Sequence, residues 1–217
     1  MSILIQAVRF NRTMSGVLAR RLSHNSISPN TVTAAGLAMG FLGSFLISFG
    51  DARNMLFGAA ALHLTFILDC ADGDLARLTN RHSEFGRRFD VLCDLLVESA
   101  LWSGLVFACR EKFPVTELPW IYAAAIAGTV FNFLLIRRER RVGCSFHIAD
   151  EKDEKRKNSL FFAFLESLAH NGISILFAYA AALAADPFLM LVGGAVFVNG
   201  LWLIRLAVNF RALMNLR

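Results

Sequence analysis

Charged residues and proline are scarce in this sequence. Charged side chains make up 18% of the 217 residues, only four residues are proline, and no Pro-rich linker or internal repeat is evident. Hydrophobic residues make up 56%, 20 residues are phenylalanine, and the mean hydropathy is +0.52. Soluble domains rarely have this composition. The sequence therefore predicts one membrane domain over residues 1–217, with an interfacial helix and linker at 1–29 and a transmembrane bundle at 30–210.

Cysteine is also scarce, and it lacks the paired spacing of a metal site. The four cysteines are Cys70, Cys93, Cys109 and Cys144. Isolated cysteines in helices that face the cytoplasm are typically reduced and serve as small packing residues. We expect no disulfide framework.

The hydrophobic residues form six stretches of membrane-spanning length. Crossing a hydrocarbon core of roughly 30 Å takes about 20 helical residues. The stretches are 31–49, 54–78, 85–109, 118–136, 159–185 and 188–210, and several contain polar residues. We expect an all-α integral membrane protein whose six transmembrane helices pack as a bundle. In the first span, Gly36, Gly40 and Gly43 form a small-residue face suited to close helix packing.

Lysine and arginine are distributed unevenly between the two ends of these spans. The set on one side is Arg9, Arg12, Arg20, Arg21, Arg77, Arg81, Arg87, Arg88, Arg137, Arg138, Arg140, Arg141, Lys152, Lys155, Arg156, Lys157, Arg205, Arg211 and Arg217. Only Arg53, Arg110 and Lys112 lie on the other side. Because basic residues accumulate in cytoplasmic loops, we expect an inner (cytoplasmic) membrane location with both termini in the cytoplasm. The net charge of +5 then indicates attraction to anionic membrane lipid, and nucleic acid is not an expected partner.

Residues 3–22 are too polar to span a membrane. Apolar residues recur there at helical spacing with arginines between them, which predicts an amphipathic helix lying in the interface. The alternative is a cleaved signal peptide, but arginines interrupt the apolar core that such a peptide needs.

Four aspartates lie within otherwise apolar spans: Asp69, Asp72, Asp90 and Asp94. A lone carboxylate at membrane depth is costly, so four within one short stretch indicate a bound cation. Each pair projects from one side of its helix. Asp69 lies about 22 Å along its helix from Asn54, and Asp94 about 24 Å from Arg110, so the pairs should meet at similar depth, toward the cytoplasm. All-oxygen ligands favour Mg²⁺ or Mn²⁺ over zinc. The alternative is ion pairing with Arg77, Arg87 and Arg88.

The spacing of these residues resembles the signature of a known family. The pattern Asp69-x2-Asp72-Gly73-x2-Ala76-Arg77-x8-Gly86-x3-Asp90-x3-Asp94 is similar, position for position, to that of the CDP-alcohol phosphotransferase (CDP-alcohol phosphatidyltransferase) family. The match covers 26 residues with eight fixed positions. The six-span plan, cytoplasmic termini and interfacial first helix also resemble this family.

The resemblance implies an enzyme of phospholipid biosynthesis that transfers a phosphatidyl or related phosphoryl group to an alcohol and releases CMP. The expected donor is CDP-linked, with CDP-diacylglycerol the first candidate. In the family, residues matching Asp69, Asp72 and Asp90 hold two metal ions, and the residue matching Asp94 contributes a ligand and acts as the general base. Two cations would neutralise the diphosphate and the departing phosphate, and a carboxylate would take the hydroxyl proton. The resemblance also implies a homodimer.

The same resemblance assigns nucleotide contacts to Gly73, Arg77 and Ser83. The segment from Ser28 to Thr33 is similar to the family's opening of the first span, where Asn30 and Thr33 would line the cytidine pocket. Proline followed by asparagine is also a common helix start, so capping remains an alternative for this segment.

Three arginines are candidates for binding a phosphorylated acceptor such as inositol phosphate or glycerol phosphate. Arg137 and Arg138 end the fourth span, and Arg205 lies near the same end of the sixth. Alternatively, Arg205 extends to lipid headgroups or pairs with Glu166. Glu98 follows Asp94 by one helical turn, and we expect it either to support the site or to pair with another helix.

Two other function classes remain open from the residues. Intramembrane carboxylates also occur in cation-coupled transporters, and a catalytically inactive membrane scaffold is a third possibility. The acidic cluster is confined to one side, and no inverted repeat is visible, which disfavours the transporter.

Overall fold

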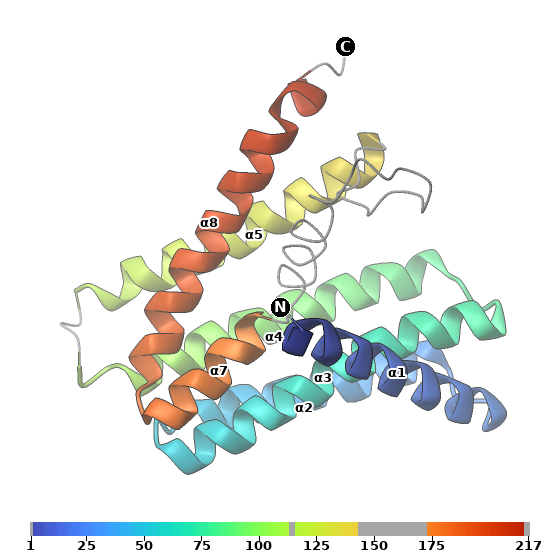
Figure 1. The fold of residues 1–217 in the computed structure, drawn as a ribbon, viewed down its shortest axis with the longest axis horizontal. Coiled ribbons are helices and arrows are strands. Elements are labelled where there is room, and N and C mark those ends of the chain that lie inside the picture. The colour runs from blue at the N-terminus through green and yellow to red at the C-terminus, as the bar shows by residue number, and fades with distance from the viewer. Residues whose placement is uncertain (1, 113–115, 143–172, 215–217) are drawn as a thin grey trace.

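The computed structural model describes residues 2–112, 116–142 and 173–214, and every regular element among them is an α-helix. The helices are α1 (Ser2–His24), α2 (Pro29–Ile47), α3 (Ala52–Thr79), α4 (Glu84–Ala108), α5 (Leu118–Val142), α7 (Ile173–Ala184) and α8 (Pro187–Met214) (Figure 1).

Local capping explains where three of the central helices begin. Ser28 accepts a hydrogen bond from the backbone N–H of Thr31, and Pro29 follows it at the first helical position of α2. Asp51 caps α3 and Ser83 caps α4 in the same way, each through the N–H three residues on. Such side-chain caps satisfy backbone donors that the helix itself leaves unpaired. Ser28 and Pro29 thus form a capped start of α2, and the nucleotide contacts of Asn30 and Thr33 stay a prediction.

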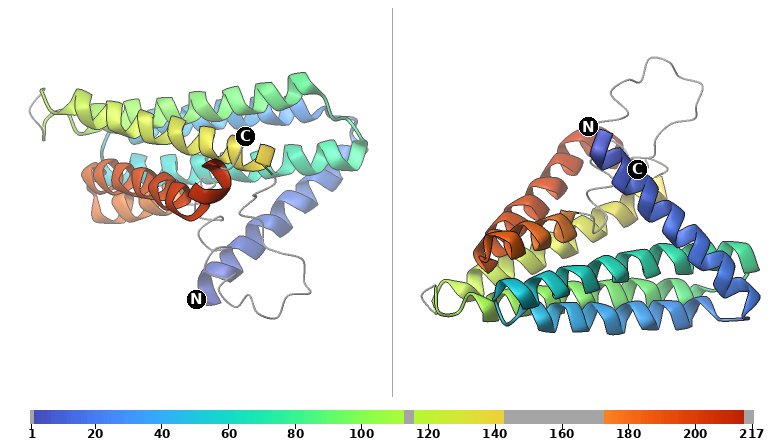
Figure 2. Two further views of the ribbon diagram at one scale, coloured as in Figure 1. Left: turned by 90° about the horizontal axis from the view of Figure 1, so that it is seen from above. Right: turned by 60° about the horizontal axis from the view of Figure 1, so that its bottom comes forward.

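Helices α2, α3 and α4 pack side by side, and α5 packs along α8, which leans away from these three (Figures 1 and 2). The small-residue face of α2 makes this close packing possible. A Cβ on Gly43 would lie 2.9 Å from the carbonyl oxygen of Gly58, and a Cβ on Gly58 would lie 2.7 Å from that of Gly43. Both distances are too short for a real side chain. The expected packing role of Gly36, Gly40 and Gly43 is confirmed, because all three are buried.

The tightly packed core lies at the end of the bundle where α2 ends and α3 begins. Its fully buried members include Ile47, Met55, Leu105, Met190 and Leu191. A second, smaller cluster of Ala19, Val32 and Leu75 joins α1 to α2 and α3 near the opposite end. Dense packing is therefore concentrated away from the aspartates, which lie in the other halves of α3 and α4.

Five described helices are long and apolar enough to cross a membrane: Pro29–Ile47, Ala52–Thr79, Glu84–Ala108, Leu118–Leu135 and Pro187–Ile204. The expectation of six spans is not confirmed. Most of the expected span at 159–185 falls in residues 143–172, which lie outside the described residues. The described part of that span forms α7, which has only 12 residues. Residues 3–22 do form a helix, α1, but its location in the membrane interface remains a prediction.

Candidate metal and phosphotransfer site

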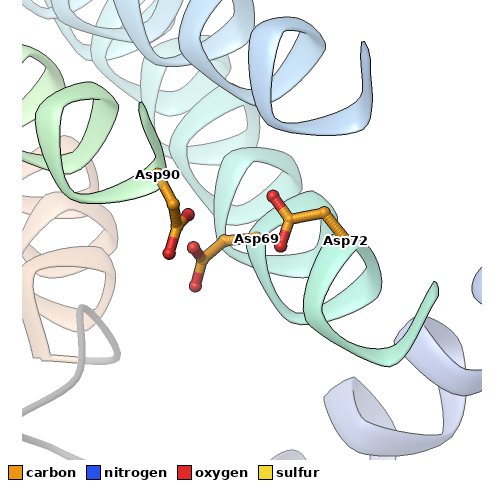
Figure 3. Close-up of side chains that lie close together, drawn as sticks. All are labelled: Asp69, Asp72 and Asp90. Carbon is orange, nitrogen blue, oxygen red and sulfur yellow. The ribbon is translucent and has the colours of Figure 1, made fainter. Parts of the chain in front are cut away.

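Asp69 and Asp72 lie on α3, and Asp90 lies on α4. One carboxylate oxygen from each of these three residues comes within 4.8 Å of the others (Figure 3). The figure shows the Asp90 side chain extending from α4 toward Asp69, with Asp72 on the other side of Asp69. The expected meeting of the two helices at similar depth is confirmed for these residues.

The three arginines considered as countercharges are engaged with other carboxylates. Arg77 pairs with Asp74 at 2.6 Å, and Glu84 pairs with Arg87 at 2.8 Å and with Arg88 at 3.7 Å. All three arginine side chains are more than half exposed. Ion pairing with these arginines therefore does not explain the aspartate cluster.

The donor set at this point fits a divalent cation. Three carboxylates converge from two apolar helices, and mutual repulsion between ionised carboxylates at this distance needs a positive charge to offset it. Oxygen ligands suit hard cations such as Mg²⁺ and Mn²⁺. The Oγ1 of Thr33 donates a 2.5 Å hydrogen bond to Asp72 Oδ2, which orients that carboxylate as outer partners of metal ligands commonly do.

Asp94 lies beside this group without being part of it. A cavity of about 20 Å³ is lined by all four aspartates together with Thr33, Thr65 and Cys93, among others. A second cavity of about 40 Å³ adjoins it through Asp69 and Asp94 and extends along α3 and α4 to Leu62 and Leu101. Asp94 therefore faces space next to the three-carboxylate group.

The residues expected to contact a nucleotide lie where α2 and α4 begin and α3 ends. The distribution of arginines predicts that this end faces the cytoplasm. A Cβ on Gly86 would lie 2.9 Å from Asn30 Oδ1 and 3.0 Å from Ser83 Oγ, so α2 and α4 approach closely here. A Cβ on Gly73 would meet only the Arg77 guanidinium within 4 Å, which leaves the backbone of α3 open on that face. Thr33 differs from these residues because its hydroxyl is committed to Asp72 and to the carbonyl oxygen of Pro29.

The three candidate acceptor arginines lie on α5 and α8, and two contacts show how these helices are aligned. Asn199 of α8 donates to the carbonyl oxygen of Ala124 on α5, and Trp202 stacks on Phe131 with ring centroids 5.3 Å apart. Arg138, on α5, is exposed. Arg137 and Arg205 lie on α5 and α8, but their side chains, and Glu166, fall outside what the structure describes.

Several interactions were not predicted from the sequence. No spacing pattern connects Thr33 to Asp72, because they lie on different helices. Cys93 lines the cavity that the four aspartates share, and its place in the motif directly before Asp94 could have predicted this from the sequence. Both ring nitrogens of His63 have neighbours, with Nε2 3.0 Å from Asn11 Oδ1 and Nδ1 3.5 Å from the Tyr179 hydroxyl. Cys93 and Cys109 are buried free thiols, whereas Cys144 lies outside the described residues.

Curated relatives share parts of this chain. A bifunctional IPC transferase and DIPP synthase of Aquifex aeolicus is 24% identical over 57% of this chain and 28% of its own length. A phosphatidylinositol phosphate synthase of Mycobacteroides abscessus is 28% identical over 46% of this chain and 45% of its own length. The chain thus spans less than half the length of either relative.

Solved structures share the fold. A Mycobacterium tuberculosis phosphatidylinositol phosphate synthase in complex with manganese and citrate is 19% identical, with a TM-score of 0.62 over 93% of this chain and 89% of that one. The same enzyme with CDP-DAG bound has a TM-score of 0.59, at 18% identity over 93% and 94% of the two chains. The family model for CDP-alcohol phosphatidyltransferase matches residues 26–190. Together with five apolar helices, this match indicates a multi-pass membrane protein. The chain belongs to the CDP-alcohol phosphatidyltransferase family.

Proposed function

We propose that this protein catalyses metal-dependent transfer of a phosphatidyl group from a CDP-linked lipid donor to an alcohol, with release of CMP. The observation that carries the proposal is the convergence of Asp69, Asp72 and Asp90 beside Asp94 within apolar helices. CDP-diacylglycerol is the proposed donor, supported by the similar M. tuberculosis enzyme whose structure has CDP-DAG bound.

Each carboxylate has a distinct proposed role. Asp69, Asp72 and Asp90 hold two Mg²⁺ or Mn²⁺ ions, and Thr33 keeps Asp72 in its ligating orientation. When bound, the cations polarise the phosphorus and stabilise the phosphate of departing CMP. Asp94 lines the adjoining cavity, where it would take the proton of the attacking hydroxyl and would contribute a ligand to a bound cation.

The donor nucleotide is proposed to bind where α2, α3 and α4 meet at their cytoplasmic ends. Asn30 and Ser83 present oxygen atoms there, Gly73 leaves backbone accessible, and the guanidinium of Arg77 is exposed. Arg137, Arg138 and Arg205 are proposed to hold a phosphate of the acceptor, which agrees with the name of the M. abscessus relative, a phosphatidylinositol phosphate synthase. A homodimer with its active site facing the cytoplasm is proposed by family resemblance.

The test measures CMP release by purified protein from CDP-diacylglycerol and Mg²⁺ with each of a panel of alcohols. CMP release should require both the metal and an added alcohol. Asp69→Ala and Asp90→Ala should eliminate release at every metal concentration, because each removes a ligand. Glu84→Gln is the matched control, since Glu84 is an exposed carboxylate of α4 that lies outside the three-carboxylate group and forms ion pairs with Arg87 and Arg88.

Two outcomes would contradict the proposal. Turnover that survives complete chelation would remove the metal role. Failure to release CMP with any alcohol would favour the transporter or scaffold, and metal uptake into proteoliposomes would then separate those two. The described residues contain one acidic group of metal-binding geometry, at one end of the bundle, which supports the enzyme over the transporter.

A further inference from the structure

Glu98 is the one acidic residue of the larger cavity that the proposed chemistry does not use. It lies on α4 one turn beyond Asp94, about 6 Å further along the helix axis and toward the packed end of the bundle. It lines the cavity of about 40 Å³ together with Asp69 and Asp94. The cavity thus leads from the reacting centre to a second carboxylate.

Glu98 lacks a hydrogen-bond donor for one of its oxygens. Its carboxylate is within hydrogen-bonding reach of the Trp102 indole, but Oε2 is buried and has no partner among the described residues. An orphaned buried acceptor costs about 1–3 kcal/mol, and more when it is charged. The terminal torsion of a glutamate is broad, so a small rotation presents this oxygen to the cavity.

A second orphaned acceptor lies at the same level of the neighbouring helix. Oδ1 of Asn132 on α5 is likewise buried without a partner in the described structure. Trp102 Nε1 donates to Thr129 Oγ1 at 3.3 Å, which sets the register of α4 against α5. Because the two helices run antiparallel, Glu98 and Asn132 each lie about one turn from this contact in the same direction. Asn132 is not among the residues that line the cavity, so the unsatisfied oxygen of Glu98 alone indicates a ligand that brings a hydrogen-bond donor.

The charge and size of the cavity restrict what this ligand can be. Its titratable lining residues are Asp69, Asp94 and Glu98, and its remaining lining residues are Thr65 and apolar side chains. As a carboxylate, Glu98 only accepts hydrogen bonds, so the ligand group that faces it must bring a donor. The cavity of about 40 Å³ is small, so the group that enters it beside Glu98 has few atoms. A hydroxyl or an ammonium fits both conditions.

We infer that Glu98 recognises a hydroxyl or ammonium group that the acceptor alcohol carries beside its reacting hydroxyl. This inference rests on the proposed function, because it assigns Asp94 to the reacting hydroxyl. Side chains four apart on a helix have Cβ atoms about 5–6 Å apart, a span that one small alcohol can bridge with donors on nearby carbons. Any phosphate of the acceptor then points out of this cavity, toward the arginines of α5 and α8.

The test compares acceptors with analogues that lack one donor. Glycerol 3-phosphate is paired with 3-hydroxypropyl phosphate, inositol 1-phosphate with a deoxyinositol 1-phosphate, and L-serine with 3-hydroxypropanoate. CMP release from CDP-diacylglycerol gives kcat and KM for each. A hydrogen bond to a charged group is worth roughly 1.5–3 kcal/mol, so the parent should prefer the donor-bearing member of one pair at least tenfold in kcat/KM. A preference in the serine pair would identify an ammonium, and in the other pairs a hydroxyl.

Variants of Glu98 then separate recognition from a packing role. Glu98→Ala should reduce the ratio of kcat/KM within the pair to near one, because KM for the donor-bearing acceptor should rise. The isosteric Glu98→Gln should keep part of a hydroxyl preference and lose an ammonium preference. Ser99→Ala is the control, since the Ser99 hydroxyl donates to the Leu95 carbonyl oxygen of its own helix and Ser99 does not line the cavity, so its preference should equal the parent's.

Other outcomes overturn the inference. If Glu98→Ala and Glu98→Gln lower kcat/KM equally for both members of every pair, Glu98 has a structural role, such as binding an internal water. An active parent without a preference in any pair would overturn the inference alone. A parent that releases no CMP with any alcohol would instead contradict the proposed function on which the inference rests.

Discussion

Asp94 and Asp90 lie one turn apart on α4, yet their surroundings differ. Asp90 shares the three-carboxylate group with Asp69 and Asp72, whereas Asp94 lines both cavities beside that group. A metal ligand must be held by its neighbours, whereas a general base needs space for the substrate hydroxyl next to it. The position of Asp94 suits the second requirement.

Replacing Asp94 with asparagine tests this difference. Asp94→Asn keeps the shape of the side chain but removes the proton acceptor, so we expect kcat for CMP release to fall by about 10²–10⁴. CDP-diacylglycerol binding, followed by the ligand-dependent rise in melting temperature, should remain. Turnover near the parent rate would exclude Asp94 as the base. Loss of donor binding together with activity would instead indicate a role in holding the site together.

At the scale of the elements, an ion pair joins two of the turns at the tightly packed end of the bundle. Lys112 follows α4, and its Nζ donates to Asp186 Oδ1 at 2.6 Å. The same oxygen accepts from the backbone N–H of Phe188 at 3.1 Å, at the start of α8. The hydrogen bond from Lys112, followed by the smaller effect of that backbone bond, holds the pKa of Asp186 below its ordinary value.

This lowered pKa predicts a pH-dependent contribution to stability. The contribution is fully present above the pKa of the unfolded carboxyl, about 3.9, and is lost as the pH falls through the lower folded value. Asp186→Asn should therefore lower stability at pH 7 by less than about 1 kcal/mol, because the pair is partly exposed, and the difference from the parent should shrink below about pH 4. Thermal unfolding in detergent across pH measures it. A difference that grows on acidification would contradict the assignment.

The whole molecule has two unlike ends. The acidic group and cavities lie toward the end where α3 meets α4, and the dense core lies toward the other. Arg81 lies in the turn between α3 and α4, while Glu111 follows α4 at the opposite end. The excess of basic residues at the first end predicts that it faces the cytoplasm.

Cysteine labelling tests this orientation. A membrane-impermeant maleimide applied to intact cells should label Glu111→Cys and leave Arg81→Cys unlabelled until the membrane is opened. Both positions are exposed, so access to reagent depends on the side of the membrane rather than on burial. The parent protein, with its native cysteines, measures the background. The reverse pattern would place the proposed active site on the outer face.

The sequence by itself determined the acidic motif, the family and four of the five membrane-length helices nearly to their ends. The spacing of aspartates on one helix decides which side they share, so Asp69, Asp72 and Asp90 could be predicted as one group. The fifth membrane-length helix, Pro187–Ile204, was expected at 188–210, so its start agrees more closely than its end. The expected span at 159–185 is unconfirmed because most of it lies outside the described residues.

Only the tertiary structure decided how residues on different helices relate. It places the hydroxyl of Thr33 on Asp72, and it leaves Glu98 beside a cavity with one unsatisfied oxygen. These relations depend on how closely the helices approach, as α2 and α3 do at Gly43 and Gly58, and on the cavity that Ile175 of α7 helps to line. Hydrophobic periodicity predicts that a helix is present and which side it buries, but distances of a few ångströms between helices arise from side-chain packing across them.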